Sequence, residues 1–166
     1  MGHFRSCSLA LLAAVLVACA PGLVGNSLAG KGQSTSTPTT TANTISSSAT
    51  VDGMVGGTVR CGRWTVVVPP GAYSGAGTIT ISVPDKSATT CDLDIKPGGL
   101  NGFLVPVELS LSTQGLNVDP TTLTIYWYDP ATGKWMDVHG TGDSGKQTLT
   151  AYLYHFSTYA AGKAGW

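Results

Sequence analysis

The chain has 166 residues, of which 42% are hydrophobic and 11% charged, and its nine Lys and Arg balance nine Asp and Glu. A net charge of zero argues against a nucleic-acid-binding protein, which needs a basic surface to neutralise phosphates. The hydrophobic content argues against a highly charged disordered chain, while 22 Gly, nine Pro and many Ser and Thr favour strands joined by turns.

Residues 1–18 resemble the signal peptide of a bacterial lipoprotein. His3 and Arg5 give a weakly basic start, and an apolar run from Leu9 to Val17 follows. This run is shorter than the about 20 residues that span a bilayer, and it suits the apolar region of a signal peptide. The run ends in Leu16-Val17-Ala18-Cys19, which resembles a lipobox, so we expect cleavage before Cys19 and lipidation of its thiol. The alternative is an ordinary signal peptide that is cut nearby. We therefore expect an exported protein, held by its lipid in the cell membrane or outer membrane and facing away from the cytoplasm.

Residues 19–50 are predicted to form a flexible tether. Between Ser34 and Thr50, twelve of seventeen residues are Ser or Thr, with almost no charge and no apolar period. Such a segment buries too little surface to offset the entropy lost on ordering it. We expect it to hold the following domain, residues 51–166, away from the membrane.

Residues 51–166 are predicted to form an all-β domain, specifically an antiparallel β-sandwich. Five stretches alternate apolar and polar residues with the period of two that is typical of half-buried strands. Turn residues such as Pro69-Pro70-Gly71 and Asp129-Pro130 separate them. The apolar faces are Trp64, Val66 and Val68; Ile79, Ile81 and Val83; Val105, Val107, Leu109 and Leu111; Leu123, Ile125 and Trp127; and Leu149, Ala151 and Leu153.

The four cysteines divide by position. Cys7 lies in the signal segment and Cys19 is the expected lipid site, which leaves Cys61 and Cys91 in the domain. Two domain cysteines in an exported protein usually pair, so we expect a Cys61–Cys91 disulfide. Metal binding by this pair is disfavoured, because no second pair or nearby His completes four ligands.

The order of several short motifs resembles the ZU5 family, in particular its bacterial extracellular relatives. The most specific are Val68-Pro69-Pro70-Gly71-Ala72 and, near the end, His155-Phe156-Ser157-Thr158-Tyr159-Ala160; the resemblance covers about residues 55–161. It implies a β-sandwich that binds partners or packs against neighbouring domains, as similar domains do in netrin receptors, ankyrins and death-domain adaptors.

The sequence has no motif for catalysis on an external substrate: no Gly-x-Ser-x-Gly, no His-Glu-x-x-His, no Walker loop and no Rossmann fingerprint. We therefore expect a non-catalytic binding or structural module of the cell envelope, without cofactor or metal, whose partner is an envelope or extracellular protein or a glycan. Asp92 and Asp94 supply too few oxygens for calcium. Asp119, Asp129 and Asp143 are interpreted as turn formers.

An alternative function is self-cleavage, because some ZU5-containing relatives cleave themselves between Phe and Ser of a His-Phe-Ser triplet. The Ser157 hydroxyl would attack the carbonyl of Phe156 to give an ester that water hydrolyses, and His155 would activate the hydroxyl. The triplet also has a structural interpretation, in which His155 continues the inward side of its strand and Phe156 lies on the opposite side. We expect an intact chain.

A further alternative is glycan binding by a tyrosine face. Tyr126 and Tyr128 share one side of a strand, and Tyr152 and Tyr154 share one side of another. If these strands are neighbours, the four rings form a patch beside Trp135 that suits glycan or protein contact. The alternatives are that this side is the core or that the tyrosines only shield the sheet. Trp64 and Trp166 are interpreted as packing residues.

Overall fold

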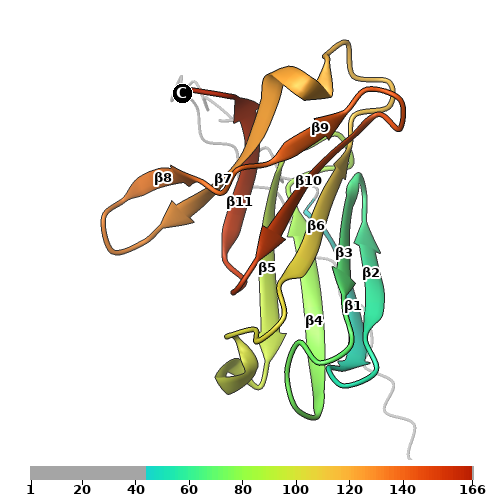
Figure 1. Cartoon of the computed structure of the whole chain (residues 1–166), viewed down its shortest axis with the longest axis vertical. Coiled ribbons are helices and arrows are strands. Elements are labelled where there is room, and N and C mark those ends of the chain that lie inside the picture. The colour runs from blue at the N-terminus through green and yellow to red at the C-terminus, as the bar shows by residue number, and fades with distance from the viewer. Residues whose placement is uncertain (1–43, 166) are drawn as a thin grey trace, which may run out of the picture. The chain divides into compact units, whose positions relative to one another are not determined.

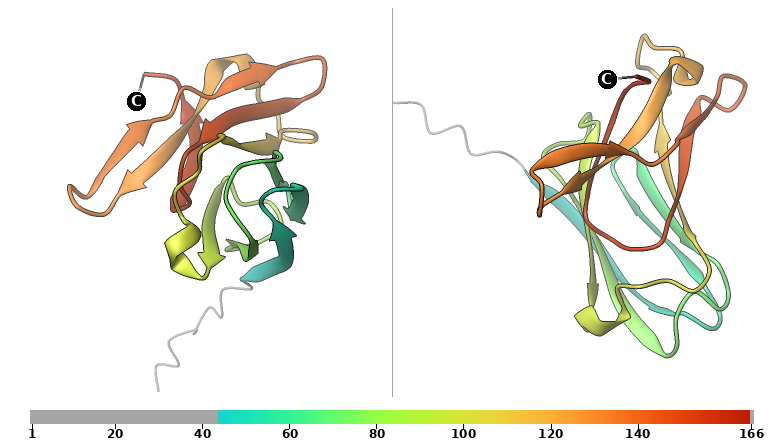
Figure 2. Two further views of the ribbon diagram at one scale, coloured as in Figure 1. Left: turned by 60° about the horizontal axis from the view of Figure 1, so that its bottom comes forward. Right: turned by 60° about the vertical axis from the view of Figure 1, so that its left-hand side comes forward.

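The computed structural model describes residues 44–165, and within this range the chain is a sandwich of two antiparallel β-sheets (Figures 1 and 2). The all-β sandwich expected from the sequence is therefore confirmed. The first sheet has the order β1-β4-β5-β11-β7-β8, with β1 (Ile45–Asp52), β4 (Ala76–Val83), β5 (Thr90–Lys96), β11 (Thr158–Lys163), β7 (Leu123–Asp129) and β8 (Lys134–Asp137). The second has the order β2-β3-β6-β10-β9, with β2 (Gly57–Cys61), β3 (Trp64–Val68), β6 (Val107–Ser112), β10 (Thr148–Leu153) and β9 (Thr141–Asp143).

Two short 3-10 helices, η1 (Gly98–Leu100) and η2 (Pro120–Thr122), connect strands of different sheets. Within residues 44–165 no helix is long and apolar enough to cross a membrane. The expected signal peptide, the lipid site Cys19 and most of the expected tether lie outside the described residues, as does Trp166.

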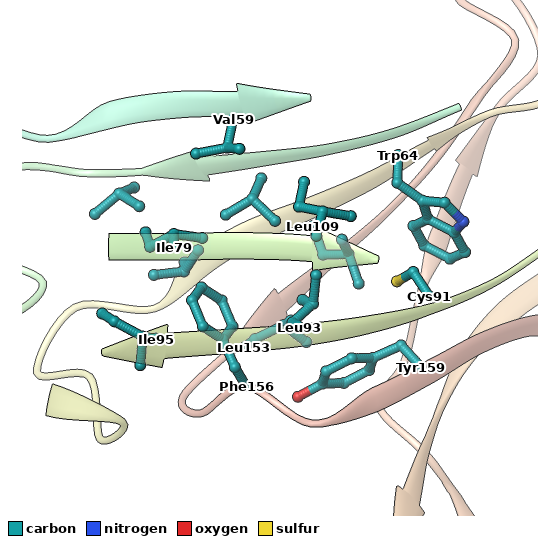
Figure 3. Packing of buried hydrophobic residues seen from close by; sticks show 14 of the residues in the cluster. Val59, Trp64, Ile79, Cys91, Leu93, Ile95, Leu109, Leu153, Phe156 and Tyr159 are labelled. Atoms are coloured by element: carbon teal, nitrogen blue, oxygen red, sulfur yellow. The ribbon is translucent and has the colours of Figure 1, made fainter. Parts of the chain in front are cut away.

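The core lies between the sheets and is built by the period-two alternation of the strands. In β3 the side chains of Trp64, Val66 and Val68 are buried while Thr65 and Val67 between them are partly exposed. Trp64 is fully buried, and its indole N–H donates to the carbonyl of Ala88 (3.2 Å), so its predicted packing role is confirmed. Figure 3 shows this tryptophan with other buried side chains of both sheets.

The domain begins before the boundary expected from composition. Residues 45–50, which the Ser/Thr content assigned to the tether, belong to β1, and β1 pairs with β4 along its whole length. On the outer side the hydroxyls of Ser48 and Thr80 are 2.8 Å apart, and those of Thr50 and Thr78 are 3.1 Å apart. Main-chain hydrogen bonds to β4 thus order this segment, although its small side chains bury little surface. The domain boundary, expected at residue 51, is corrected to the start of β1.

The expected orientation of the His-Phe-Ser triplet is also corrected. The alternation of β10 ends at Leu153, and the loop that follows puts Phe156 into the core, where its ring meets Phe103 edge-on with centroids 4.7 Å apart. His155 is only partly buried. Because the loop breaks the strand period, parity within β10 does not extend to these residues.

Candidate functional site

The aromatic residues of the predicted tyrosine face lie on different sheets. Tyr126 and Tyr128 are on β7 of the first sheet, and Tyr152 is on β10 of the second. Tyr126 is 4% exposed, and its hydroxyl donates to the carbonyl of Lys163 (2.7 Å). Tyr128 lies against Trp135, with ring centroids 5.3 Å apart. The structure thus brings Tyr128 and Trp135 together and leaves Tyr152 on the other sheet.

Tyr152 and Tyr154 are the most exposed of the predicted aromatic residues, at 62% each. Tyr152 alternates with the buried Ala151 and Leu153, so it stands on the outer side of the second sheet. Tyr154 follows the last residue of β10 and belongs to the loop before β11. The two rings therefore differ in setting, although their exposure is equal.

An open groove of about 510 Å³ lies on the outer side of the second sheet, beside Tyr152. We call it the polar groove. It crosses β6, β10 and β9, three adjacent strands that Figure 1 shows side by side, and reaches the β9–β10 turn. Its lining residues are Glu108, Ser110, Thr141, Asp143, Lys146, Thr148, Thr150 and Tyr152.

Strand pairing arranges the lining residues in rows across the groove. Thr150 pairs with Ser110 on one side and with Thr141 on the other, which makes a row of three hydroxyls. Tyr152 pairs with Glu108. Side chains at paired positions on the same face of a sheet are close neighbours, so a carboxylate stands next to the exposed aromatic ring.

The side chains of the polar groove are largely unpartnered within the described part of the chain. No hydrogen bond there engages the side-chain oxygens of Glu108, Ser110, Thr141, Thr148 or Thr150. Two hydroxyls on the outer side of the first sheet differ, because Ser48 and Thr50 are each bonded to a threonine across the β1–β4 pair. The free donors and acceptors of the polar groove are therefore available to a ligand.

Charges in the polar groove nearly cancel. The Lys146 ammonium is 3.5 Å from the Asp143 carboxylate in an exposed ion pair. The backbone N–H of Lys146 also donates to Asp143 (3.0 Å), and this bond is the main reason why the pKa of Asp143 is lowered. Glu108 is the remaining charge among the lining residues.

One close backbone approach fixes the edge of the polar groove. Gly142, the middle residue of β9, lies against the backbone of Pro120 and Thr121 in η2, and a Cβ at this position would overlap both. The Ser144 hydroxyl donates to Asp119 (2.8 Å), the residue that caps η2. Glycine is therefore required at position 142 for β9 to lie where it lines the groove.

The His155-Phe156-Ser157 triplet lies in the loop between β10 and β11. The imidazole of His155 meets the ring of Trp127 edge-on at 4.8 Å, and the Ser157 hydroxyl is 3.4 Å from the carbonyl oxygen of Tyr128. No hydrogen bond joins His155 to Ser157 among the described residues. The carbonyl of Phe156 accepts a hydrogen bond from the side-chain amide of Asn101 (3.0 Å). The triplet therefore has a polarised carbonyl, but its imidazole is not placed against the hydroxyl.

Cys61 and Cys91 come from opposite sheets, and both are buried free thiols in the structure. The thiol of Cys61 points to the carbonyl of Ile45 (3.7 Å). Burial raises the pKa of Cys91 well above its usual value, with smaller contributions from Asp92 and Cys61. The expected disulfide is not formed in this structure, and its formation in the exported protein stays a prediction.

Of the two aspartates weighed as calcium ligands, one has a side-chain partner among the described residues. Asp92 accepts a hydrogen bond from the Thr158 hydroxyl (2.6 Å). Asp119, Asp129 and Asp143 each accept a backbone N–H two or three residues later, which confirms their interpretation as turn formers. Within residues 44–165 no group of three or more His, Cys, Asp or Glu could hold a metal ion.

Most lining residues of the polar groove were not singled out from the sequence. The outward Ser and Thr residues of β6 and β10 show the expected alternation, but their meeting depends on the pairing of two strands that are far apart in the chain. Only Tyr152 belongs to both the predicted face and the polar groove.

Comparison with known proteins gives a partial similarity. No family model matches the chain. An amylopullulanase from Thermoanaerobacterium thermosulfurigenes is 38% identical over 72 residues, which are 42% of this chain and 4% of that protein. The chain therefore matches a small segment of a much longer relative.

Proposed function

We propose that the chain is an exported, lipid-anchored β-sandwich module of the cell envelope, similar to ZU5 domains, which binds a ligand without catalysis. The polar groove is its binding surface. The observation that carries this proposal is the set of unpartnered polar side chains held in rows on one sheet face.

A sheet face is well suited to binding because its backbone is already fixed. Each lining side chain of β6, β9 and β10 projects from a paired strand, so little conformational entropy is lost when a ligand engages it. Polar groups on an ordinary surface are satisfied by water, and a groove concentrates them where one ligand can reach several at once.

The tether gives the module its reach. Twenty-five residues lie between the expected lipid site, Cys19, and the first strand, and they correspond to at most about 90 Å of extended chain. Diacylation is a stable anchor because two chains each contribute about 0.8 kcal/mol per buried methylene. The anchored module can therefore search for a ligand well away from the membrane surface.

The partial relative favours a polysaccharide over a protein as the ligand. Its name, amylopullulanase, denotes an enzyme that acts on polysaccharide. The shared segment is only 4% of that protein. The similarity therefore supports polysaccharide as the class of ligand and does not support an enzymatic activity.

Self-cleavage between Phe156 and Ser157 is the alternative. It is favoured by one contact, the hydrogen bond from the Asn101 amide to the carbonyl that Ser157 would attack, since a donor there stabilises a developing oxyanion. It is weakened by the position of His155 against Trp127. We retain the binding module as the primary function.

The proposal is tested by filling the polar groove. Thr150→Trp puts an indole at the centre of the row of hydroxyls, and Thr58→Trp, on an exposed position of β2 outside the groove, is the matched control. We expect Thr150→Trp to abolish retention on insoluble polysaccharide or isolated envelope fragments, and the control to be retained. Equal retention of the two variants would reject the groove as the binding surface.

The anchoring part is tested separately with Cys19→Ser. We expect the unaltered protein in the membrane fraction and the variant in the soluble exported fraction. A variant that stays with the membrane would reject lipidation at Cys19 without bearing on the groove.

A further inference from the structure

We propose that the polar groove takes an uncharged polysaccharide chain, with Tyr152 as the stacking surface for one sugar ring and Glu108 as the acceptor for its hydroxyls. This inference rests on the proposed function and names the ligand class and the two residues that determine specificity.

The first argument is the match of functional groups. The lining offers hydroxyls of Ser110, Thr141 and Thr150 in one row, with no hydrogen bond to any described residue. A hydroxyl both donates and accepts, as every sugar hydroxyl does. The core of a protein–protein interface is instead enriched in aromatic residues, Met and Arg, and the polar groove has one aromatic residue among its eight.

The second argument is the pairing of Tyr152 with Glu108. The Tyr152 side chain is 62% exposed, so its ring is open to a ligand. An aromatic ring supplies flat apolar area for the C–H side of a sugar. The paired Glu108 carboxylate is a hydrogen-bond acceptor, and it lies where it can accept from the hydroxyls at the edge of the same sugar. Together the two side chains can contact the C–H face and the hydroxyl edge of one pyranose.

The third argument is charge. Lys146 is the one cationic side chain among the lining residues, and its ammonium is paired with Asp143. The Glu108 carboxylate is therefore the uncompensated charge of the groove. An anionic polymer would meet Glu108 without compensation, and like charges in contact oppose binding. An uncharged chain suffers no such repulsion.

The fourth argument is direction. The rows of lining residues run across β6, β10 and β9, at the inter-strand spacing of about 4.8 Å. A polymer with a short repeat laid across the strands follows such a row and meets one lining side chain on each strand. The groove is open, so a long chain can pass through it rather than only insert an end.

The test is calorimetric titration of the purified full chain with maltohexaose, cellohexaose and mannohexaose, and with polygalacturonate as the anionic probe. We expect at least one uncharged hexaose to bind and polygalacturonate not to bind. Tyr152→Ala should weaken that binding at least tenfold, and Glu108→Gln about three- to tenfold.

Tyr154→Ala is the matched control, because Tyr154 has the same exposure as Tyr152 but does not line the groove. It should bind like the unaltered protein. No binding of any uncharged hexaose, or binding that Tyr152→Ala leaves unchanged, would overturn the inference. If Thr150→Trp blocks a protein or anionic ligand instead, the ligand class is wrong and the binding module stands. If no ligand depends on the groove, both fail.

Discussion

The side-chain amide of Asn101 forms two hydrogen bonds with the backbone of Phe156, 55 residues later in the chain. Its oxygen accepts from the Phe156 N–H (2.6 Å) and its nitrogen donates to the Phe156 carbonyl (3.0 Å). The loop before β11 has no strand partner at this point, so a side chain from the segment after η1 supplies both bonds. This link fixes the ring of Phe156 against Phe103 in the core.

Removal of the Asn101 amide should destabilise the domain. Asn101→Ala leaves the N–H and the carbonyl of Phe156 without partners, and each lost bond costs about 1 kcal/mol. We expect a loss of about 1–2 kcal/mol in the free energy of unfolding, measured by urea denaturation. Asn117→Ala, at an exposed asparagine, is the control and should change little. A loss in the control equal to that of Asn101→Ala would refute the role of the two bonds.

The strands that the sequence located correctly are those whose alternation is apolar on one side. β3, β4, β6 and β10 each bury the residues expected from period two. β7 departs from the expectation, because it buries Thr124 and Tyr126 beside Ile125 and leaves Leu123 and Trp127 only partly buried. β1 was assigned to the tether because Ser and Thr make up half of it, and its order comes from pairing with β4. The Ser and Thr content of a segment indicates how much side-chain surface it can bury, but it does not reveal main-chain pairing with a distant strand.

The candidate site depends on the register between strands, which no local sequence pattern contains. The alternation of β6 and β10 predicts which residues face outward, but only strand register puts Glu108 beside Tyr152 and Ser110 beside Thr150. The four tyrosines illustrate the converse, because equal parity on two strands does not imply one surface when the strands lie in different sheets.

The chain is expected to stay intact at the Phe156–Ser157 bond. Self-cleavage needs a base against the Ser157 hydroxyl, but that hydroxyl donates instead to the carbonyl of Tyr128 (3.4 Å). Intact mass under denaturing conditions should give one species, with Ser157→Ala as the reference for an uncleavable chain. A fragment ending at Phe156, absent from the Ser157→Ala protein, would establish self-cleavage and move attention from a ligand to the product.

Export into an oxidising compartment should join Cys61 to Cys91. Both thiols are buried in the space between the sheets, and closing a loop of about 30 residues stabilises a domain by about 3–4 kcal/mol in the chain-entropy model. The exported protein should be lighter than the reduced protein by two hydrogens in non-reducing mass spectrometry. Thiol titration of the unfolded, unreduced protein that still finds both thiols would contradict the bridge.

Alkaline pH should destabilise the reduced protein earlier than the oxidised one. Burial raises the pKa of Cys91 well above 9.0, its usual value, and also raises that of Tyr159 above 10.0. Between the unfolded and the folded pKa the folded state holds the extra proton, so stability is full below the unfolded pKa and falls as pH rises, by about 1.4 kcal/mol per pH unit for each group.

Burial also raises the pKa values of Cys61 and Tyr73. The loss should therefore begin near pH 9 when the two cysteines are thiols, and near pH 10 when only the buried tyrosines can ionise. Urea midpoints measured from pH 8 to pH 11, with and without reductant, give the comparison. Reduced Cys91→Ala should lose less stability above pH 9 than the reduced unaltered protein, because Cys61 is then the one domain thiol left to ionise. Identical pH dependence of reduced protein and reduced Cys91→Ala would contradict the assignment to this thiol.

Gly142→Ala should disturb the edge of the polar groove. Its Cβ would overlap the backbone of Pro120 in η2, and backbone cannot yield as a flexible side chain can. Forcing an extra methyl into a packed contact costs about 1–3 kcal/mol, so we expect that loss in urea denaturation together with weaker retention on the groove's ligand, because β9 carries Thr141 and Asp143.

Gly102→Ala is the control, since a Cβ there meets no atom within 4 Å. It should retain the stability and binding of the unaltered protein, which separates the loss of one contact from a general effect of replacing glycine. Gly142→Ala with unaltered stability would mean that β9 can move away from η2 at little cost. In that case the groove edge is adjustable, and its residues contribute less to affinity than Glu108 and Tyr152 on the paired central strands.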